Sequence, residues 1–257
     1  MKLKHIFPFL VPAIMAACKP DNQTSGGGDN TLPEPPETVV DAHVFIVDLF
    51  STLGEDSYFI GRDPSVATEY IKNQQQKLSL VYMFDRSDFT VGKSNPMTDI
   101  AYATGLNPLF AQCNATDGTM TPGTGMLTRY PISDYDGISC EGAHLSGCRI
   151  SVPVTGTPSL YISTAKIVSL HQAETIYRER KNRLASDCII VGTVANGESR
   201  QVVDYFNSGS LRAVAYSVGE NDFDILVVTP ANYVCRGYVE GKTVNLPYYR
   251  ISIEKWM

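Results

Sequence analysis

Short apolar runs rich in β-branched residues recur along the chain, separated by polar stretches that contain Gly and Pro. Such runs predict β-strands, most of them with both faces covered. The predicted strands span residues 43–49, 78–84, 125–130, 149–154, 159–167, 188–194, 211–217, 223–228 and 248–253. The runs show no internal repeat, so each strand is expected to have its own place in the fold.

Apolar positions at helical spacing predict four helices between these strands. The longest covers residues 169–186 and carries one apolar stripe. The other three span residues 65–77, 96–104 and 199–206. Because strands outnumber helices and the two kinds alternate, the pattern predicts two β-sheets packed face to face with helices outside them, an α/β (α+β) fold.

The start of the chain has the three-part layout of a secretory signal peptide. Two lysines precede the apolar run 6–14, which is too short to span a bilayer permanently, and two alanines precede Cys18. The pattern resembles the bacterial lipobox. This implies that residues 1–17 are a cleaved signal and that Cys18 carries a membrane anchor with acyl chains such as palmitate. The expected location is the cell envelope. Since Lys19 is not the aspartate that retains lipoproteins at the inner membrane, the outer membrane of a Gram-negative bacterium is favoured.

A polar segment follows the predicted signal. From Lys19 onward it reads KPDNQTSGGGDNTLPEPPETV and is almost free of large apolar side chains. Such a composition cannot bury enough apolar surface to offset the entropy of ordering, so residues 18–40 are predicted to be the lipidated cysteine and a flexible tether. Residues 41–257 contain no second linker-like cluster and are predicted to form one domain.

Charge and cysteine spacing narrow the function classes. The formal net charge of −6 argues against a nucleic-acid-binding surface, so the expected partners are the membrane, through the lipid, and an unknown protein or glycan. Cys140 and Cys148 bracket the loop-like stretch EGAHLSG, and in an oxidising compartment a disulfide between them is a hypothesis. No cysteine pair has CxxC spacing, so a structural zinc site is not expected.

Several strings occur in the order typical of the endonuclease/exonuclease/phosphatase superfamily. The strings IAYATGLNPLF at 100–110 and GTGMLTRYPI at 123–132 resemble that family's helix and its "GxAILSRYPI" strand. LYISTAKI at 160–167 stands where the family has "NTHLD", and CIIVGTVAN at 188–196 stands where it has "GDFN". DILVVTP at 224–230 looks like "IDYIFVS". The resemblance implies a four-layered α/β sandwich over nearly the whole predicted domain.

The residues that perform the family's chemistry are mostly replaced in this sequence. Phosphoester cleavage needs a metal to neutralise developing charge, a base to prepare water, and donors at the phosphoryl oxygens. In the NTHLD-like strand the asparagine, histidine and aspartate are replaced by Ser163, Ala165 and Ile167. In the GDFN-like turn the aspartate and the asparagine are replaced by Thr193 and Ala195. Ala165, at the position of the histidine, cannot donate to a phosphate or transfer a proton.

A few polar residues remain near the expected site. Asp85 stands at the family's metal-binding glutamate and is the candidate metal ligand, although a lone carboxylate holds a divalent cation poorly. Asp224 and Asn196 are the candidate catalytic residues that the resemblance leaves. His144 and His171 stand at no family position and are predicted to be surface or capping residues.

These observations favour a membrane-anchored pseudoenzyme, in which an endonuclease/exonuclease/phosphatase-like domain acts as a binding or structural module without a cofactor. The alternative is a divergent Mg- or Mn-dependent phosphodiesterase or phosphatase that acts on an extracytoplasmic phosphoester through Asp85, Asp224 and Asn196. A third interpretation is an unrelated carbohydrate-binding or adhesion domain. A purely antiparallel sandwich without a helix at 169–186 would favour it.

Overall fold

A computed structural model gives the positions of most residues of the predicted domain. The residues it describes are 37–45, 65–74, 80–90, 96–112, 120–140, 143–152, 159–217, 223–242 and 247–255. They belong to one compact unit, Glu34–Met257. Within these ranges, no helix has both the length and the apolar character needed to cross a membrane.

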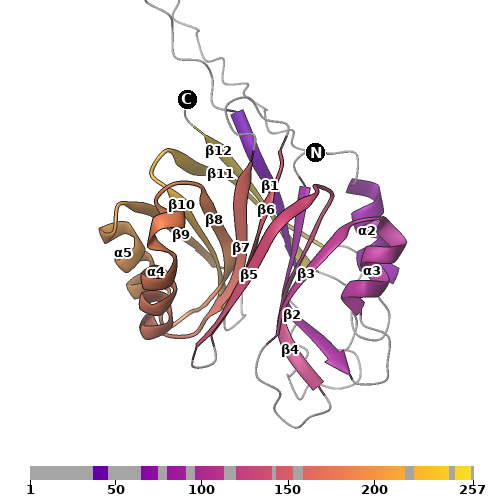
Figure 1. The fold of residues 1–257 in the computed structure, drawn as a ribbon, viewed down its shortest axis with the longest axis horizontal. Helices are drawn as coiled ribbons and strands as arrows, with labels where there is room; N and C mark the ends of the chain where they lie inside the picture. The colour runs from indigo at the N-terminus through magenta and orange to yellow at the C-terminus, as the bar shows by residue number, and fades with distance from the viewer. Residues whose placement is uncertain are drawn as a thin grey trace, which may run out of the picture. The chain divides into compact units, whose positions relative to one another are not determined.

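Two six-stranded β-sheets form the centre of the fold (Figure 1). The first sheet contains β1 (Glu37–Phe45), β2 (Leu80–Thr90), β3 (Asn107–Gln112), β4 (Met120–Thr128), β11 (Tyr233–Lys242) and β12 (Pro247–Lys255). The second contains β5 (Ile132–Cys140), β6 (Ala143–Ile150), β7 (Leu160–Ile167), β8 (Cys188–Ala195), β9 (Leu211–Ser217) and β10 (Phe223–Pro230).

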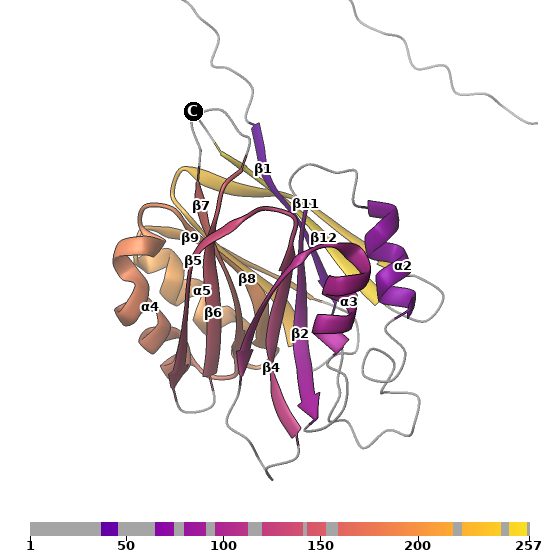
Figure 2. The ribbon, with the colours of Figure 1, turned by 45° about the vertical axis from the view of Figure 1, so that its right-hand side comes forward.

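Both sheets are mixed, with one parallel pair of strands among antiparallel neighbours. The first has the order β11-β12-β1-β2-β4-β3 and its parallel pair is β1–β2. The second has the order β5-β6-β7-β8-β10-β9 and its parallel pair is β7–β8. In Figure 2 the arrowheads of β2 and β5 point to the same end of the sandwich, and β5 runs in the direction of β7 because two antiparallel pairings separate them. The carboxyl ends of both parallel pairs therefore lie at one end.

The first strand begins earlier than predicted. β1 starts at Glu37, inside the residues 18–40 that composition assigned to a tether. Its register pairs Val40 with Ile253 of β12 and Asp41 with Leu80 of β2. β-branched residues such as Val39 and Val40 favour an extended backbone, and the pairing with β12 begins at Glu37, so the domain boundary is corrected to lie before residue 37.

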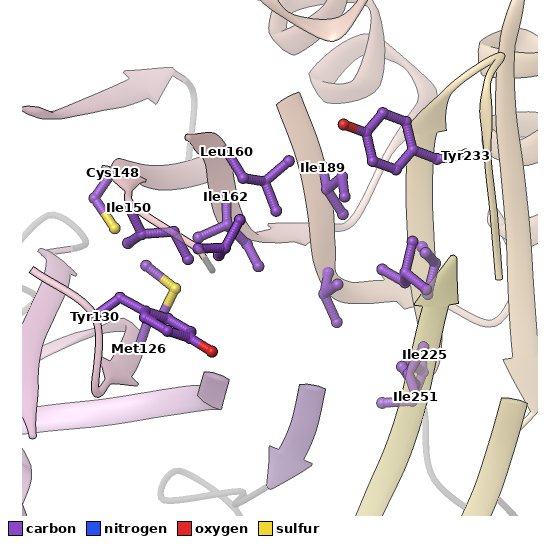
Figure 3. Packing of buried hydrophobic residues seen from close by; sticks show 14 of the residues in the cluster. Met126, Tyr130, Cys148, Ile150, Leu160, Ile162, Ile189, Ile225, Tyr233 and Ile251 are labelled. Carbon is purple, nitrogen blue, oxygen red and sulfur yellow. The ribbon is translucent and has the colours of Figure 1, made fainter. Parts of the chain in front are cut away.

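The main core lies between the sheets and follows from the alternation of side chains along each strand. Met126 on β4 and Ile251 on β12 meet residues such as Ile162 on β7 and Ile189 on β8, and all four are fully buried. Figure 3 shows these side chains pointing toward one another from the two sheets. A sandwich with apolar inner faces is the architecture that the sequence pattern predicted.

The opposite face of the second sheet is covered by α4 (Leu170–Leu184) and α5 (Ser199–Ser208). Ala173 and Ile176 of α4 and Phe206 of α5 are buried against this face. On the first sheet, α3 (Pro96–Thr104) contacts β2, β3 and β4, and α2 (Ser65–Gln74) packs beside α3. The layers are thus helix, sheet, sheet, helix, so the predicted four-layered α/β sandwich is confirmed (Figure 1).

Candidate functional site

The candidate site lies where β7 and β8 end, at the end of the sandwich where β1 and β2 also finish. The chain leaves β7 at Ile167 and enters α4, and it leaves β8 at Ala195 and turns through residues 196–198 into α5. Ligand sites in α/β folds commonly form at the carboxyl ends of parallel strands. The same place is where the resemblance puts the family's catalytic groups.

The NTHLD-like positions of β7 face the helices. Ala165 and Ile167 belong to the buried cluster between the sheet, α4 and α5. Ser163 is fully buried, and its Oγ lies 3.7 Å from Sγ of Cys188 in the same layer. Because alternate strand residues point to opposite faces, these three side chains are directed away from the first sheet.

Lys166 lies on the opposite face of β7, the face from which Leu160 and Ile162 point toward the first sheet, and the sequence comparison did not identify it. Its Nζ lies 4.4 Å from the ring centroid of Phe223, at the start of β10. Register places Thr193 of β8 beside Lys166, and Ala195 of β8 beside Phe223. β8 separates β7 from β10, so the lysine side chain reaches across β8 to the ring. The period-2 alternation of residues 160–167 was the signal that could have identified Lys166.

The GDFN-like end of β8 has lost its acid and its amide. Thr193 is fully buried on the face that Lys166 shares, and Ala195 is half-buried. Asn196, the candidate catalytic residue one step later, is exposed in the turn that follows β8. The backbone of this turn closes through a 2.9 Å hydrogen bond from the N–H of Glu198 to the carbonyl oxygen of Ala195.

Asp224, the second candidate catalytic residue, has a structural partner. The hydroxyl of Ser199, the first residue of α5, donates a hydrogen bond to Oδ2 of Asp224. Asp224 shares a strand face with Leu226, which packs in the helix-facing cluster, so its carboxylate lies on the same side as α5. Sequence reasoning did not identify Ser199 as this partner.

The first turn of α4 is closed by side chains of the protein itself. Ser169 is the N-cap, and its Oγ accepts from the N–H of Gln172 at 3.4 Å. Oε2 of Glu198 accepts from the N–H of Leu170 at 3.2 Å, which places a negative charge at the positive end of the helix. An anion is therefore not needed to satisfy this helix terminus, and Glu198 would repel one there.

The metal that the resemblance implies is not matched by the residues described. In the described parts of the chain, no three His, Cys, Asp or Glu side chains are grouped closely enough to hold a metal ion. Asp85 lies on β2, beside the irregularity between Phe84 and Ser87, but its side chain is outside what the structure describes. Asp224 faces the helix layer, and Lys166 lies on the inter-sheet face. This end of the second sheet therefore carries a positively charged side chain at the place where the resemblance would put the ligands of a metal ion.

The predicted disulfide between Cys140 and Cys148 is wrong. The two residues lie on the antiparallel hairpin β5–β6, where Cys140 pairs with Ala143 and Cys148 pairs with Tyr135. A separation of five residues along a strand is about 17 Å, well beyond the roughly 7 Å limit between the Cα atoms of a disulfide. Cys148 is a free, buried cysteine. The stretch between the cysteines forms most of β6 and not a loop.

His171, which the sequence places outside the catalytic positions, lies on the first turn of α4. Its imidazole is exposed, and its Nδ1 lies 3.8 Å from Oε2 of Glu174. The prediction of a surface histidine is confirmed for this residue. His144 lies on β6, with its side chain outside what the structure describes.

Comparison with solved structures identifies the fold as that of the endonuclease/exonuclease/phosphatase proteins. A family member from Leptotrichia buccalis has a TM-score of 0.58 at 9% identity, covering 84% of this chain and 99% of that chain. A member from Beutenbergia cavernae has a TM-score of 0.57 at 9% identity, covering 84% and 72%. The human Nocturnin catalytic domain with bound sulfate has a TM-score of 0.59 at 7% identity, covering 85% and 97%. No protein-family model and no curated protein matches the sequence.

Proposed function

We propose that this protein is a lipid-anchored binding module that has kept the phosphoesterase-like sandwich and lost its hydrolytic chemistry. The observation that carries the proposal is Lys166, whose Nζ lies 4.4 Å over the Phe223 ring on the face that Thr193 and Ala195 share. A lysine ammonium in this position repels a divalent cation and attracts an anionic group. The proposed ligand therefore presents an anion at this end, as a phosphorylated or acidic glycan or a protein with an acidic segment would do.

Loss of acid–base groups supports the same proposal. General acid–base catalysis contributes about 10² to 10⁴ in rate, and the positions of the family's histidine and aspartates on β7 and β8 hold Ala165, Ile167 and Thr193. Asp224, which remains, is hydrogen-bonded to Ser199. Replacement of all the lost groups by residues elsewhere would require a second, independently built site.

The alternative function is a divergent Mg- or Mn-dependent phosphoesterase. Its specific support is the likeness of fold, including to the human Nocturnin domain that holds a sulfate anion. That sulfate is also compatible with a module that binds an oxyanion without cleaving an ester. The two functions differ in what the site should prefer, a divalent cation or an anion.

Calorimetric titration of the chain from residue 19 onward separates the two. The proposal expects saturable binding of sulfate or inorganic phosphate that Lys166→Ala removes, together with no saturable binding of Mg²⁺ or Mn²⁺. Lys181→Ala, an exposed lysine of α4, is the matched control and should bind the anions like the parent chain. Micromolar binding of Mg²⁺ or Mn²⁺ that Asp85→Ala abolishes would support the phosphoesterase and contradict the proposal.

The membrane anchor is a separate part of the proposal. Export, cleavage after residue 17 and lipidation of Cys18 rest on the charged, apolar and small-residue segments of the first residues. Mass spectrometry of the mature protein from a bacterial membrane fraction tests it. The expected N-terminal peptide begins at Cys18 with acyl chains attached, and an unmodified N-terminus at another residue would contradict the anchor.

A further inference from the structure

A cavity lies where the edges of the two sheets meet, at the opposite end of β10 from Asp224. Its volume is about 180 Å³, it is open to solvent on one side, and it is lined by residues of β9, β10 and β11. β9 is an edge strand of the second sheet and β11 is an edge strand of the first. A turn at residues 231–232 carries the chain from β10 to β11, and the β11–β12 register shifts between Cys235 and Gly237.

Half of the residues that line this cavity are aliphatic. They are Ala213, Val214, Val227 and Val234. Val227 is buried in the core between the sheets, and Val214 packs against that core, so the cavity continues the apolar interior toward the surface. An apolar group that enters it is removed from water and stabilised in proportion to the area it buries.

Two of the polar groups in the lining already have partners. The hydroxyl of Thr229 donates to the carbonyl oxygens of Tyr233 at 3.3 Å and of Arg212 at 3.5 Å. The hydroxyl of Tyr216 donates to Sγ of Cys235 at 3.1 Å. Neither hydroxyl hydrogen needs a ligand.

The guanidinium of Arg212 is the charged group of the lining. Arg212 is exposed, and among the residues that the structure describes it forms no ion pair. An arginine binds a carboxylate through two parallel hydrogen bonds, and one guanidinium matches the single charge of a monocarboxylate. A ligand that suits this cavity therefore has an apolar body and one carboxylate at its end.

The volume limits the size of that body. An apolar cavity of about 150 Å³ holds one benzene molecule, and this cavity is about 180 Å³. We infer that the cavity between β9, β10 and β11 is a binding site for a small monocarboxylate, with one ring or a chain of about six carbons inside and the carboxylate on Arg212. This inference does not depend on the function proposed for the other end of the sandwich.

Cys235 provides a reporter for occupancy because its half-buried thiol lines the cavity. The test uses the chain from residue 19 onward, with benzoate and hexanoate as probes. Calorimetry should give dissociation constants of about 0.1 to 10 mM, the range for ligands of this size. Each probe should also slow the alkylation of Cys235 by iodoacetamide, as followed by peptide mass spectrometry. Benzyl alcohol, which lacks the carboxylate, should protect less at equal concentration.

Arg212→Gln should weaken benzoate binding by about tenfold or more and leave benzyl alcohol unchanged, since a hydrogen bond to a charged group is lost. Arg236→Gln is the matched control, because Arg236 pairs with Glu254 at 3.4 Å and does not line the cavity. Equal benzoate affinity in Arg212→Gln and the parent would overturn the inference. So would the absence of both saturable binding and Cys235 protection in the parent chain, a result that does not depend on any variant folding.

Discussion

The hydroxyl of Ser199 donates a hydrogen bond to the carboxylate of Asp224 and so joins the first turn of α5 to the start of β10. The N-cap residue of α5, Glu198, makes no capping hydrogen bond with its own side chain, and its carboxylate instead accepts from Leu170 at the start of α4. The acids at this end of the second sheet thus hold helices in place. A carboxylate that serves the fold in this way is a poor candidate for a metal ligand or a base.

This structural role predicts that Asp224→Ala lowers the free energy of unfolding by about 1 to 3 kcal/mol, the cost of removing a charged acceptor from a partly buried hydroxyl. Ser199→Ala should cost a similar amount. In a double-mutant cycle measured by urea unfolding, the two changes should be less than additive, because each removes the same hydrogen bond. Strictly additive losses would show that the hydrogen bond between Ser199 and Asp224 does not contribute to stability.

Gly192 of β8 lies against the backbone of Ala165 on β7. A Cβ atom at this position would overlap the backbone carbonyl of Ala165, which cannot move without disturbing the strand pair. Gly192→Ala should therefore cost about 1 to 3 kcal/mol through overpacking, measured by urea or thermal unfolding.

Gly197→Ala is the matched control for Gly192→Ala. Gly197 lies in the turn after β8, and a Cβ atom added there would meet nothing within 4 Å. Its effect on stability should be within about 0.5 kcal/mol, as for surface changes away from packed features. Equal losses in the two variants would contradict the close approach of the strands.

Burial raises the pKa of the Cys148 and Cys188 thiols to about 12, from an ordinary value of 9.0. In the unfolded chain the thiols ionise near pH 9, whereas in the folded chain they stay neutral until about pH 12. The stabilisation from these two neutral thiols is complete below pH 9 and is lost as the pH rises toward 12. Each thiol contributes a slope of up to about 1.4 kcal/mol per pH unit in that window.

The variant with Cys148→Ala and Cys188→Ala isolates this contribution from other titrating groups. The difference in the free energy of unfolding between the parent and this variant, measured by urea unfolding, should be smaller at about pH 10.5 than at about pH 8. At the higher pH the two thiols ionise in the unfolded parent and stabilise its unfolded state, and the variant has no such thiols to ionise. A difference that stays constant between the two pH values would mean that these thiols ionise alike in both states.

Three strands that the sequence pattern missed, β3, β5 and β11, lie at sheet edges, and the internal strand β6 was predicted only at its last two residues, 149–150. β3 and β11 are the edges of the first sheet, and β5 is an edge of the second. An edge strand has one unpaired side and less burial, so it tolerates polar residues and Gly. β5 reads ISDYDGISC and β11 reads YVCRGYVEGK, and neither contains a continuous apolar run. By contrast, the central strands β7, β8 and β10 were predicted to within a few residues, because burial on both faces demands such runs.

The candidate site was less predictable than the fold because it depends on which face each side chain occupies. String comparison placed the lost histidine at Ala165 and overlooked Lys166, yet the alternation of β7 directs Ala165 to the helices and Lys166 to Phe223. The bond between Ser199 and Asp224 joins residues 25 apart in the chain, and no local pattern marks it. The disulfide hypothesis failed for a similar reason, since a tight hairpin places Cys148 opposite Tyr135 and not near Cys140.

The most direct test of the central claim is turnover of bis(4-nitrophenyl) phosphate by the chain from residue 19 onward, in the presence of Mg²⁺ or Mn²⁺. A domain without hydrolytic activity should release no nitrophenolate above the metal-containing blank, with no difference between the parent, Asp85→Ala and Asp224→Asn. Metal-dependent turnover that Asp85→Ala or Asp224→Asn abolishes would contradict the proposed loss of activity. It would mean that the domain hydrolyses phosphoesters through one of these two acids.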